Sequence, residues 1–389
     1  MKILAICSRI PECGKKGDQV LSFHRLSYLA LNHKIKLVCF GDAEIDSEAK
    51  SHLESFGISV ELIPWNKLVA FCNALLAVFK PESPFQCALF ESACFQNAFK
   101  TLLYEFKPDI VYAVTIRALG NIGLYKGPLF VDLVDSMALN FSRRMDMAYG
   151  LKYFLLSIEY ERVKKYEKKV TQNANRSFVV SSIDQKIIGG DRVSSLPLGV
   201  DGREFFKSNN RQLEPVIIFT GNMNYKPNVD AVLWFYQYCW IKLKHTIPNI
   251  RFVVAGANPT SAILALRADN SVNVMGRVPS IAILINSARV SIAPMQSGSG
   301  MQFKILEAMA CAVPVVSTTL GLGDIGAKVG HDILLADTPD FFVKAIISLL
   351  KSEELQKKIG NAGWQYVNEH HTWDALNADF EKSITTLLI

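Results

Sequence analysis

Residues 294–310 hold the most chemically informative pattern in the sequence. A turn of three small residues, Gly298 to Gly300, follows a strand-like run and precedes a helical one. Such a turn directs free backbone N–H groups and the positive end of the helix dipole at one point, which suits a phosphate. Lys304 and Glu307 are three residues apart on the expected helix, so both should lie on its outward face. We therefore expect a phosphate site flanked by one cation and one carboxylate.

Each part of this pattern also has an ordinary structural explanation. Glycine-rich turns precede helices in many α/β proteins that bind no ligand there. A lysine and a glutamate three residues apart often form a surface ion pair worth only about 0.2–0.5 kcal/mol. The parts occur together and in the order a binding site requires, which favours the ligand site.

A second group of candidate residues lies in the first half of the chain. Asp132 and Asp135 lie at the end of an apolar, strand-like run. Open α/β sheets bind ligands at the carboxyl ends of their strands, so either carboxylate could face an acceptor. Capping of the next helix, near Ser136, explains them equally well. Arg143 and Arg144 could hold an acceptor phosphate through paired N–H bonds, or could lie on a solvated helix face.

Composition limits the class of protein. The chain has 389 residues, half of them hydrophobic and 20% charged, which predicts two or three globular domains. A net charge of +6 gives no sign of nucleic-acid binding. The eight cysteines form no Cys-x-x-Cys pair, and there is no Asp-x-Asp pair, so we expect reduced thiols and no bound catalytic metal. No run is long enough for a signal peptide or a membrane span, which predicts a cytoplasmic protein.

Two segments bear on membrane contact. Residues 65–80 are apolar nearly all round, which suits a buried helix as well as one lying in a membrane interface. Residues 161–176 contain six basic side chains and two acidic ones, enough to attract anionic lipid. A solvated, charged helix explains the second segment equally well.

Strand-like and helical runs alternate along the whole chain. The strand-like runs are residues 3–6, 35–40, 59–63, 110–114, 129–134, 177–181, 216–221, 250–256, 272–276, 290–294 and 314–317. This alternation predicts an α/β fold of two Rossmann-like, doubly wound domains. We place an acceptor domain at 1–195, a junction and linker at 196–214 and a donor domain at 215–368. Residues 369–389 should form a helix that crosses back to the first domain.

The sequence resembles a known family over nearly its full length. Residues 305–316, Ile-Leu-Glu-Ala-Met-Ala-Cys-Ala-Val-Pro-Val-Val, resemble the signature segment of the GT-B glycosyltransferases of family 4. Residues 221–228, 198–201 and 9–18 extend the likeness, which is closest to bacterial sugar transferases of exopolysaccharide gene clusters. The resemblance implies a nucleotide-sugar site on the second domain, in a cleft that faces the first.

The resemblance also assigns roles to individual residues. It implies that Glu307 accepts the ribose hydroxyls of the donor, and that Lys304 and Lys226 lie beside its diphosphate. The implied donor-binding residues are Gly17, Asp18, Gly221, Asn222, Lys226, Gly298, Ser299, Gly300, Met301, Lys304 and Glu307. One departure concerns Ser299, which stands where the family often has a second glutamate, so the usual contacts to the donor sugar are in doubt.

These roles imply a metal-independent glycosyltransferase that acts on a glycan or polyprenyl-linked acceptor in cell-surface polysaccharide synthesis. No cofactor is expected besides the nucleotide sugar, and the enzyme would be peripheral on the inner face of the cytoplasmic membrane. The family is retaining; an inverting transfer would need a base, for which Asp135 is the candidate. Alternatives are a nucleotide-sugar epimerase of the same architecture and a non-catalytic partner subunit.

Overall fold

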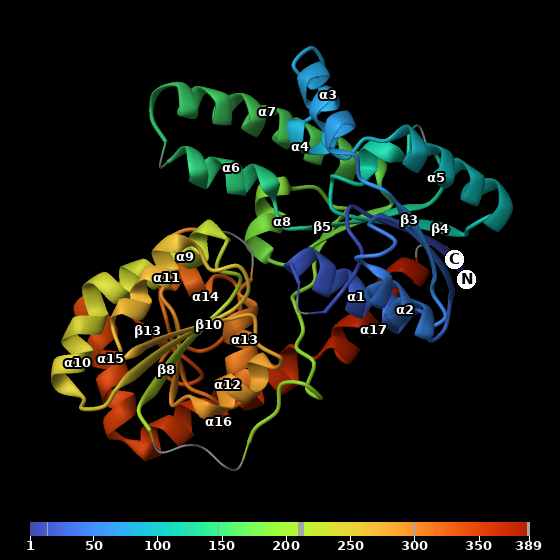
Figure 1. Cartoon of the computed structure of the whole chain (residues 1–389). Helices are drawn as coiled ribbons and strands as arrows, with labels where there is room; N and C mark the ends of the chain where they lie inside the picture. Colours follow the sequence, from blue (N-terminus) through green and yellow to red (C-terminus); the bar gives the residue numbers. More distant parts are fainter. Residues whose placement is uncertain (14, 124, 147, 209–213, 299–300, 387–389) are drawn as a thin grey trace. The chain divides into compact units, whose positions relative to one another are not determined.

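The chain folds into two compact units, each built on its own parallel sheet (Figure 1). The computed structural model describes residues 1–386 apart from residues 14, 124, 147, 209–213 and 299–300. Unit 1 consists of Met1–Leu196 and Leu376–Ile389, and unit 2 of Pro197–Ala375. The predicted fold class, α/β with two Rossmann-like sheets, is confirmed.

Unit 1 has a seven-stranded parallel sheet in the order β3-β2-β1-β4-β5-β6-β7 among the described residues. The strands are β1 (Lys2–Cys7), β2 (Lys34–Phe40), β3 (Ser59–Ile63), β4 (Ile110–Val114), β5 (Leu129–Val134), β6 (Arg176–Val179) and β7 (Val193–Ser195). The α-helices are α1 (Gly17–Leu29), α2 (Ser47–Ser55), α3 (Lys67–Ala77), α4 (Phe85–Ala88), α5 (Ala93–Phe106), α6 (Met137–Met145), α7 (Gly150–Asn173) and α8 (Ser182–Ile188). The strand order reverses between β1 and β4, and such a switch point is where open sheets bind ligands.

The core of unit 1 includes a helix from the far end of the chain. Helix α17 (Trp373–Thr385) brings Phe380 against Tyr112 and Phe178, with ring centroids 5.2 and 4.9 Å apart. The Arg25 guanidinium lies 4.5 Å from the Phe380 ring centroid and forms a buried ion pair with Asp132. Phe380, near the end of the described chain, is therefore part of the core of unit 1.

Unit 2 has a six-stranded parallel sheet in the order β10-β9-β8-β11-β12-β13, counted over the described part of the chain. The strands are β8 (Val216–Thr220), β9 (Arg251–Ala255), β10 (Val272–Gly276), β11 (Val290–Ala293), β12 (Val315–Ser317) and β13 (Leu334–Leu335). The α-helices are α9 (Lys226–Phe235), α10 (Ile241–Thr246), α11 (Ser261–Ala265), α12 (Ile281–Ser287), α13 (Phe303–Ala310), α14 (Thr319–Leu322), α15 (Pro339–Lys351) and α16 (Glu353–His370). The switch point lies between β8 and β11.

Two details differ from what the sequence pattern predicts. The pattern of residues 87–106 predicts one helix, but the structure has α4 and α5 there, because the Ser92 side chain accepts from the backbone N–H of Phe95 and so starts a new helix. The helix expected at 369–389 is α17, which begins only at Trp373, after α16 has ended at His370. No helix in the described residues is long and apolar enough to cross a bilayer.

Candidate functional site

The loops that follow β8 and β11 meet at the switch point of unit 2. Gly298 has a φ of +113°, and a Cβ there would lie 3.4 Å from the Cβ of Pro227 and 3.9 Å from the hydroxyl of Tyr225. The backbone at Gly298 is therefore held against the start of α9. Ser299 and Gly300, which we predicted to bind phosphate, lie outside the described residues. The structure therefore does not test the effect of a serine in place of the glutamate at position 299.

Two glycines allow the ends of β8 and β9 to approach each other. Gly221 and Gly256 have φ values of +147° and +145°, and a Cβ on Gly256 would fall only 1.8 Å from the carbonyl oxygen of Gly221. Only glycine fits either position. The sequence pattern identified Gly221 but not Gly256, whose role depends on a neighbour 35 residues earlier in the chain.

Helix α13 carries Lys304 into the interior, which corrects the expectation that both charges face outward. Lys304 is 7% exposed, and its ammonium donates to Gln302 Oε1 at 2.7 Å and lies 5.4 Å from the centroid of the Phe219 ring. Helical side chains lean toward the amino end of their helix, so the ammonium lies at that end of α13. The helix begins at Phe303, five residues after Gly298, and Met301 is buried before it.

Burial disfavours the charged forms of both Lys304 and Glu307. It lowers the pKa of Lys304 to about 8, although the nearby Glu307 opposes this shift. Burial also raises the pKa of Glu307 to about 7, an effect that Lys304 opposes and Glu204 reinforces. The two side chains form no ion pair within the described part of unit 2. A buried cation and a partly buried carboxylate with perturbed pKa values at a switch point are typical of a ligand site.

The turn after β8 is held by hydrogen bonds, and the lysine that follows it is exposed. Asn222 closes the turn, because its side chain accepts from the Asn224 N–H and its carbonyl accepts from Asn228 Nδ2, each at 3.0 Å. The Lys226 side chain is 77% exposed and its ammonium lies 2.7 Å from Asp230. Lys226 would have to exchange this partner to contact a diphosphate.

In unit 1, cations gather where β1 and β4 end. Arg9 pairs with Asp18 at 2.9 Å, and Asp18 follows Gly17 at the exposed start of α1. Burial, and then the charge of Arg9, lower the pKa values of both Lys16 and Arg117. Arg117 also donates to Gln86 Oε1 at 3.0 and 3.3 Å. Arg117 could not be identified from the sequence, because a single arginine after a strand belongs to no motif.

The backbone at this edge of the first sheet is strained. Thr115 directly follows β4, and Val134 is the last residue of the adjacent strand β5. Their φ values are +65° and +68°. Both are β-branched, for which a positive φ costs of order 1–3 kcal/mol. Such strain concentrates at functional sites.

Asp132 cannot contact an acceptor, which corrects one prediction. It is fully buried, pairs with Arg25 and accepts from the Tyr112 hydroxyl at 3.1 Å, because its side chain points into the core rather than out of the edge. Asp135 is partly exposed at the strand end and accepts from Asn140 Nδ2 at 2.9 Å. Ser136, rather than either aspartate, caps α6.

Glu167 of α7 also binds the start of α6. It accepts from the Met137 N–H at 2.7 Å, and burial raises its pKa to about 7. Arg143 and Arg144 occupy the last turn of α6, roughly 10 Å along the helix from Ser136. Arg144 is exposed and lies over the Phe141 ring. These arginines are therefore distant from the strand end at which we expected an acceptor phosphate.

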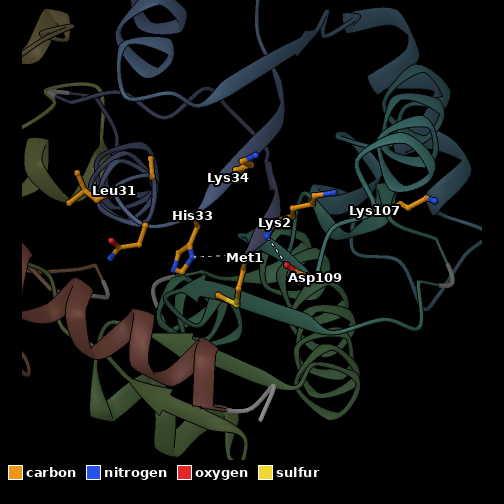
Figure 2. A pocket seen from close by; sticks show the side chains of 9 residues that line it. Met1, Lys2, Leu31, His33, Lys34, Lys107 and Asp109 are labelled. Atoms are coloured by element: carbon orange, nitrogen blue, oxygen red, sulfur yellow. Dashed lines mark hydrogen bonds between the residues drawn. The ribbon is translucent and has the colours of Figure 1, made fainter.

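A pocket of about 570 Å³ lies at the opposite end of the strands of the first sheet, where β1 and β2 begin (Figure 2). In it the Met1 amino group lies 3.3 Å from His33 Nδ1, and the Lys2 N–H donates to Asp109 at 2.7 Å. None of the residues predicted for the site lines this pocket. Over the described residues, no group of three or more His, Cys, Asp or Glu side chains could hold a metal ion.

Comparison with known proteins identifies the fold and the second unit. Residues 214–352 match the family model for glycosyl transferases group 1. A Klebsiella pneumoniae relative, described as an uncharacterized 44.6 kDa protein in cps region, is 23% identical over 95% of this chain and 96% of its own.

Two solved structures resemble the whole chain. Anabaena Alr3699/HepE in complex with UDP has a TM-score of 0.69 at 14% identity, covering 99% of this chain and 100% of its own. Sucrose-phosphate synthase from Thermosynechococcus elongatus has a TM-score of 0.73 at 13% identity, covering 100% and 99%. The fold is therefore that of the GT-B glycosyltransferases. Within it, most of the second unit is similar to glycosyl transferases group 1.

Proposed function

We propose that the protein transfers a sugar from a nucleotide-diphosphate sugar to a glycan or lipid-linked acceptor in cell-surface polysaccharide synthesis. The observation that carries this proposal is the buried Lys304 with the partly buried Glu307 on α13, beside the switch point of unit 2. The group 1 match over residues 214–352 supports a glycosyltransferase. The UDP in HepE supports the class of donor, and the cps region of the Klebsiella relative supports the polysaccharide role.

The donor is held by charge and by backbone groups. Ionised Glu307 would accept bonds from the ribose hydroxyls, while Lys304, Lys226 and the amino end of α13 would neutralise the diphosphate. These groups stabilise the negative charge that grows on the diphosphate as the bond to the sugar breaks. The protein then needs no metal for this task, so we propose a metal-independent enzyme.

We further propose that transfer retains the anomeric configuration. The acceptor hydroxyl oxygen bonds to the anomeric carbon on the face from which the diphosphate leaves. The bond from that carbon to the diphosphate oxygen breaks, and the hydroxyl proton passes to the departing diphosphate. On unit 1, Arg9, Lys16 and Arg117 would favour an acceptor that carries negative charge. The reaction would take place in the cytoplasm, at the inner face of the membrane.

Replacement of Glu307 by Gln tests the donor site. Charge-assisted hydrogen bonds are worth about 1.5–3 kcal/mol, so the Glu307→Gln variant should bind UDP about tenfold to a hundredfold more weakly in calorimetric titration. Glu354→Gln, on the exposed start of α16, is the matched control and should bind like the wild type. Unchanged UDP affinity in Glu307→Gln, with normal circular dichroism, would remove the central claim. A coupled assay in which product forms without any acceptor would favour an epimerase instead.

A further inference from the structure

Helix α3 leaves most of its apolar side chains in solvent. Only Ala70 and Ala77 of this helix are buried, whereas Leu68, Phe71 and Leu75 are 77%, 62% and 54% exposed. The exposed large apolar residues of this segment are Trp65, Leu68, Val69, Phe71, Leu75, Leu76, Val78 and Phe79. Figure 1 shows α3 standing away from the sheet of unit 1. The structure thus excludes the buried-helix explanation of residues 65–80, because this helix is exposed.

The first turns of α7 continue this apolar surface. Tyr149, Leu151, Tyr153, Phe154 and Leu155 are all between 48% and 86% exposed. Arg162, further along α7, donates to the carbonyl oxygens of Ala77 and Val78 at 3.0 and 3.3 Å, so its face of α7 lies toward α3.

Helical spacing places other residues on that same face of α7. Leu151, Leu155 and Ile158 precede Arg162 by eleven, seven and four residues, which puts all four on one stripe. Leu151 and Leu155 therefore lie on the face of α7 that Arg162 turns toward α3, and with the exposed apolar residues of α3 they form what we call the α3–α7 surface.

The charges on the α3–α7 surface are all positive. Residues 65–80 contain Lys67 and Lys80, one near each end of α3, and residues 149–158 contain Lys152. All three lysines are exposed, and neither segment contains an aspartate or glutamate. Exposed apolar and aromatic side chains rimmed by lysine are the composition of a surface that inserts into an anionic bilayer interface.

The basic residues of α7 are less available than their sequence suggests. Arg162 is bound to the end of α3, and Lys169 lies 3.6 Å from Glu82. Lys164 lies over the Tyr160 ring. Electrostatic attraction by this stretch alone is therefore weaker than the count of charges implies.

We propose that the α3–α7 surface inserts into the interface of an anionic lipid bilayer and anchors unit 1 there. Insertion is through the apolar side chains, and the lysines at the rim bind lipid phosphates. This inference goes beyond the proposed function, because it concerns a surface outside the donor site and needs no turnover.

Flotation with vesicles containing phosphatidylglycerol tests the proposal. The wild type should float with these vesicles, and part of the binding should persist in high salt, because apolar insertion is not screened. A Phe71→Ser, Leu75→Ser, Phe79→Ser variant should lose about tenfold in partition coefficient for each side chain removed. The matched control replaces Ile45 and Tyr104, which are 82% and 81% exposed elsewhere on unit 1, with serine and should float normally.

Two further measurements give independent support or refutation. Trp65 is 43% exposed and is the only tryptophan among residues 1–196, so brominated lipid should quench a fluorescence component that Trp65→Phe removes. Failure of the wild type to float, or equal flotation of the triple variant, would overturn the proposal. A wild-type dimer that the triple variant converts to a monomer would instead assign the surface to a second copy of this chain. Glu307→Gln should float normally, so failure of this proposal is distinct from failure of the donor site.

Discussion

Replacement of Lys304 by Met should stabilise unit 2 while it weakens nucleotide binding. The fall of the Lys304 pKa from 10.5 to about 8, caused mainly by burial, corresponds to about 3 kcal/mol of disfavoured charge. Methionine has a similar length and carries no charge, so the variant should recover most of this free energy. The bond to Gln302 is lost, and Glu307 becomes harder to ionise, so about 3 kcal/mol is the upper value.

The pH dependence of this gain follows from the direction of the pKa shift. Between about pH 8 and 10.5 the unfolded chain holds the lysine proton and the folded chain does not. The free energy of unfolding of the wild type therefore rises with pH across that window, and the full cost of the charge is present below about pH 8. The advantage of Lys304→Met should be largest at neutral pH and should shrink toward pH 10.5.

Thermal unfolding followed by tryptophan fluorescence measures this gain. Four of the five tryptophans lie in unit 2, so the signal reports mainly on that unit. A gain of about 3 kcal/mol should raise the midpoint of this unit by about 6–12 °C at pH 7. Lys344→Met, at an exposed position of α15, is the control and should change the midpoint little. A Lys304→Met midpoint equal to or below the wild type at pH 7, or a gain independent of pH, would refute the argument that the buried charge is costly.

Four other outcomes are expected. Affinity for a UDP-sugar should fall about fivefold from pH 8 to pH 6 in titration calorimetry, because protonation of Glu307, with its pKa of about 7, outweighs the charge that Lys304 gains. Glu307→Gln should flatten this dependence. Asp132→Asn should lower the free energy of unfolding of unit 1 by about 3–5 kcal/mol in denaturant titration, since it leaves Arg25 buried without its partner; a loss below about 1 kcal/mol would contradict this. Turnover should survive EDTA, whereas loss on chelation with recovery in magnesium or manganese would show that a metal is needed. NMR of the product should show the anomeric configuration of the donor; inversion, together with loss of turnover but not of donor binding in Asp135→Asn, would make Asp135 the catalytic base.

Much of the fold could be predicted from the sequence, because buried parallel strands are apolar along their whole length. Strands β1 and β4 are examples, since each is a continuous apolar run followed by polar or glycine residues. Strands β7 and β13 could not be found in this way, because they have only three and two residues, too few to show a pattern of apolar and polar side chains. Their pairing depends on the neighbouring strands, β6 and β12.

The site could be predicted only as far as residue types and spacing reach. The pattern identified Lys304 and Glu307, but helical spacing alone did not reveal that the lysine side chain runs inward beside Phe219. Asp132 and Asp135 were equivalent in the sequence, because the alternation of a strand ends where the chain leaves the sheet. The position of Arg117 next to Arg9 follows from the pairing of β1 with β4, which are about 100 residues apart in the chain. Local sequence patterns do not reveal such a pairing.

The contribution of α17 to unit 1 has a consequence for how the protein is made. Phe380 leaves the ribosome roughly 180 residues after Leu196, which at about 5–20 residues per second is a delay of roughly 10–40 s. During that interval Tyr112, Phe178 and Arg25 lack the ring that covers them, while nearly all of unit 2 is synthesised. The first unit to emerge is thus the last to be completed. A nascent chain stalled before residue 376 should therefore carry an incomplete first unit, open to proteases and chaperones, next to a second unit that has all of its own strands.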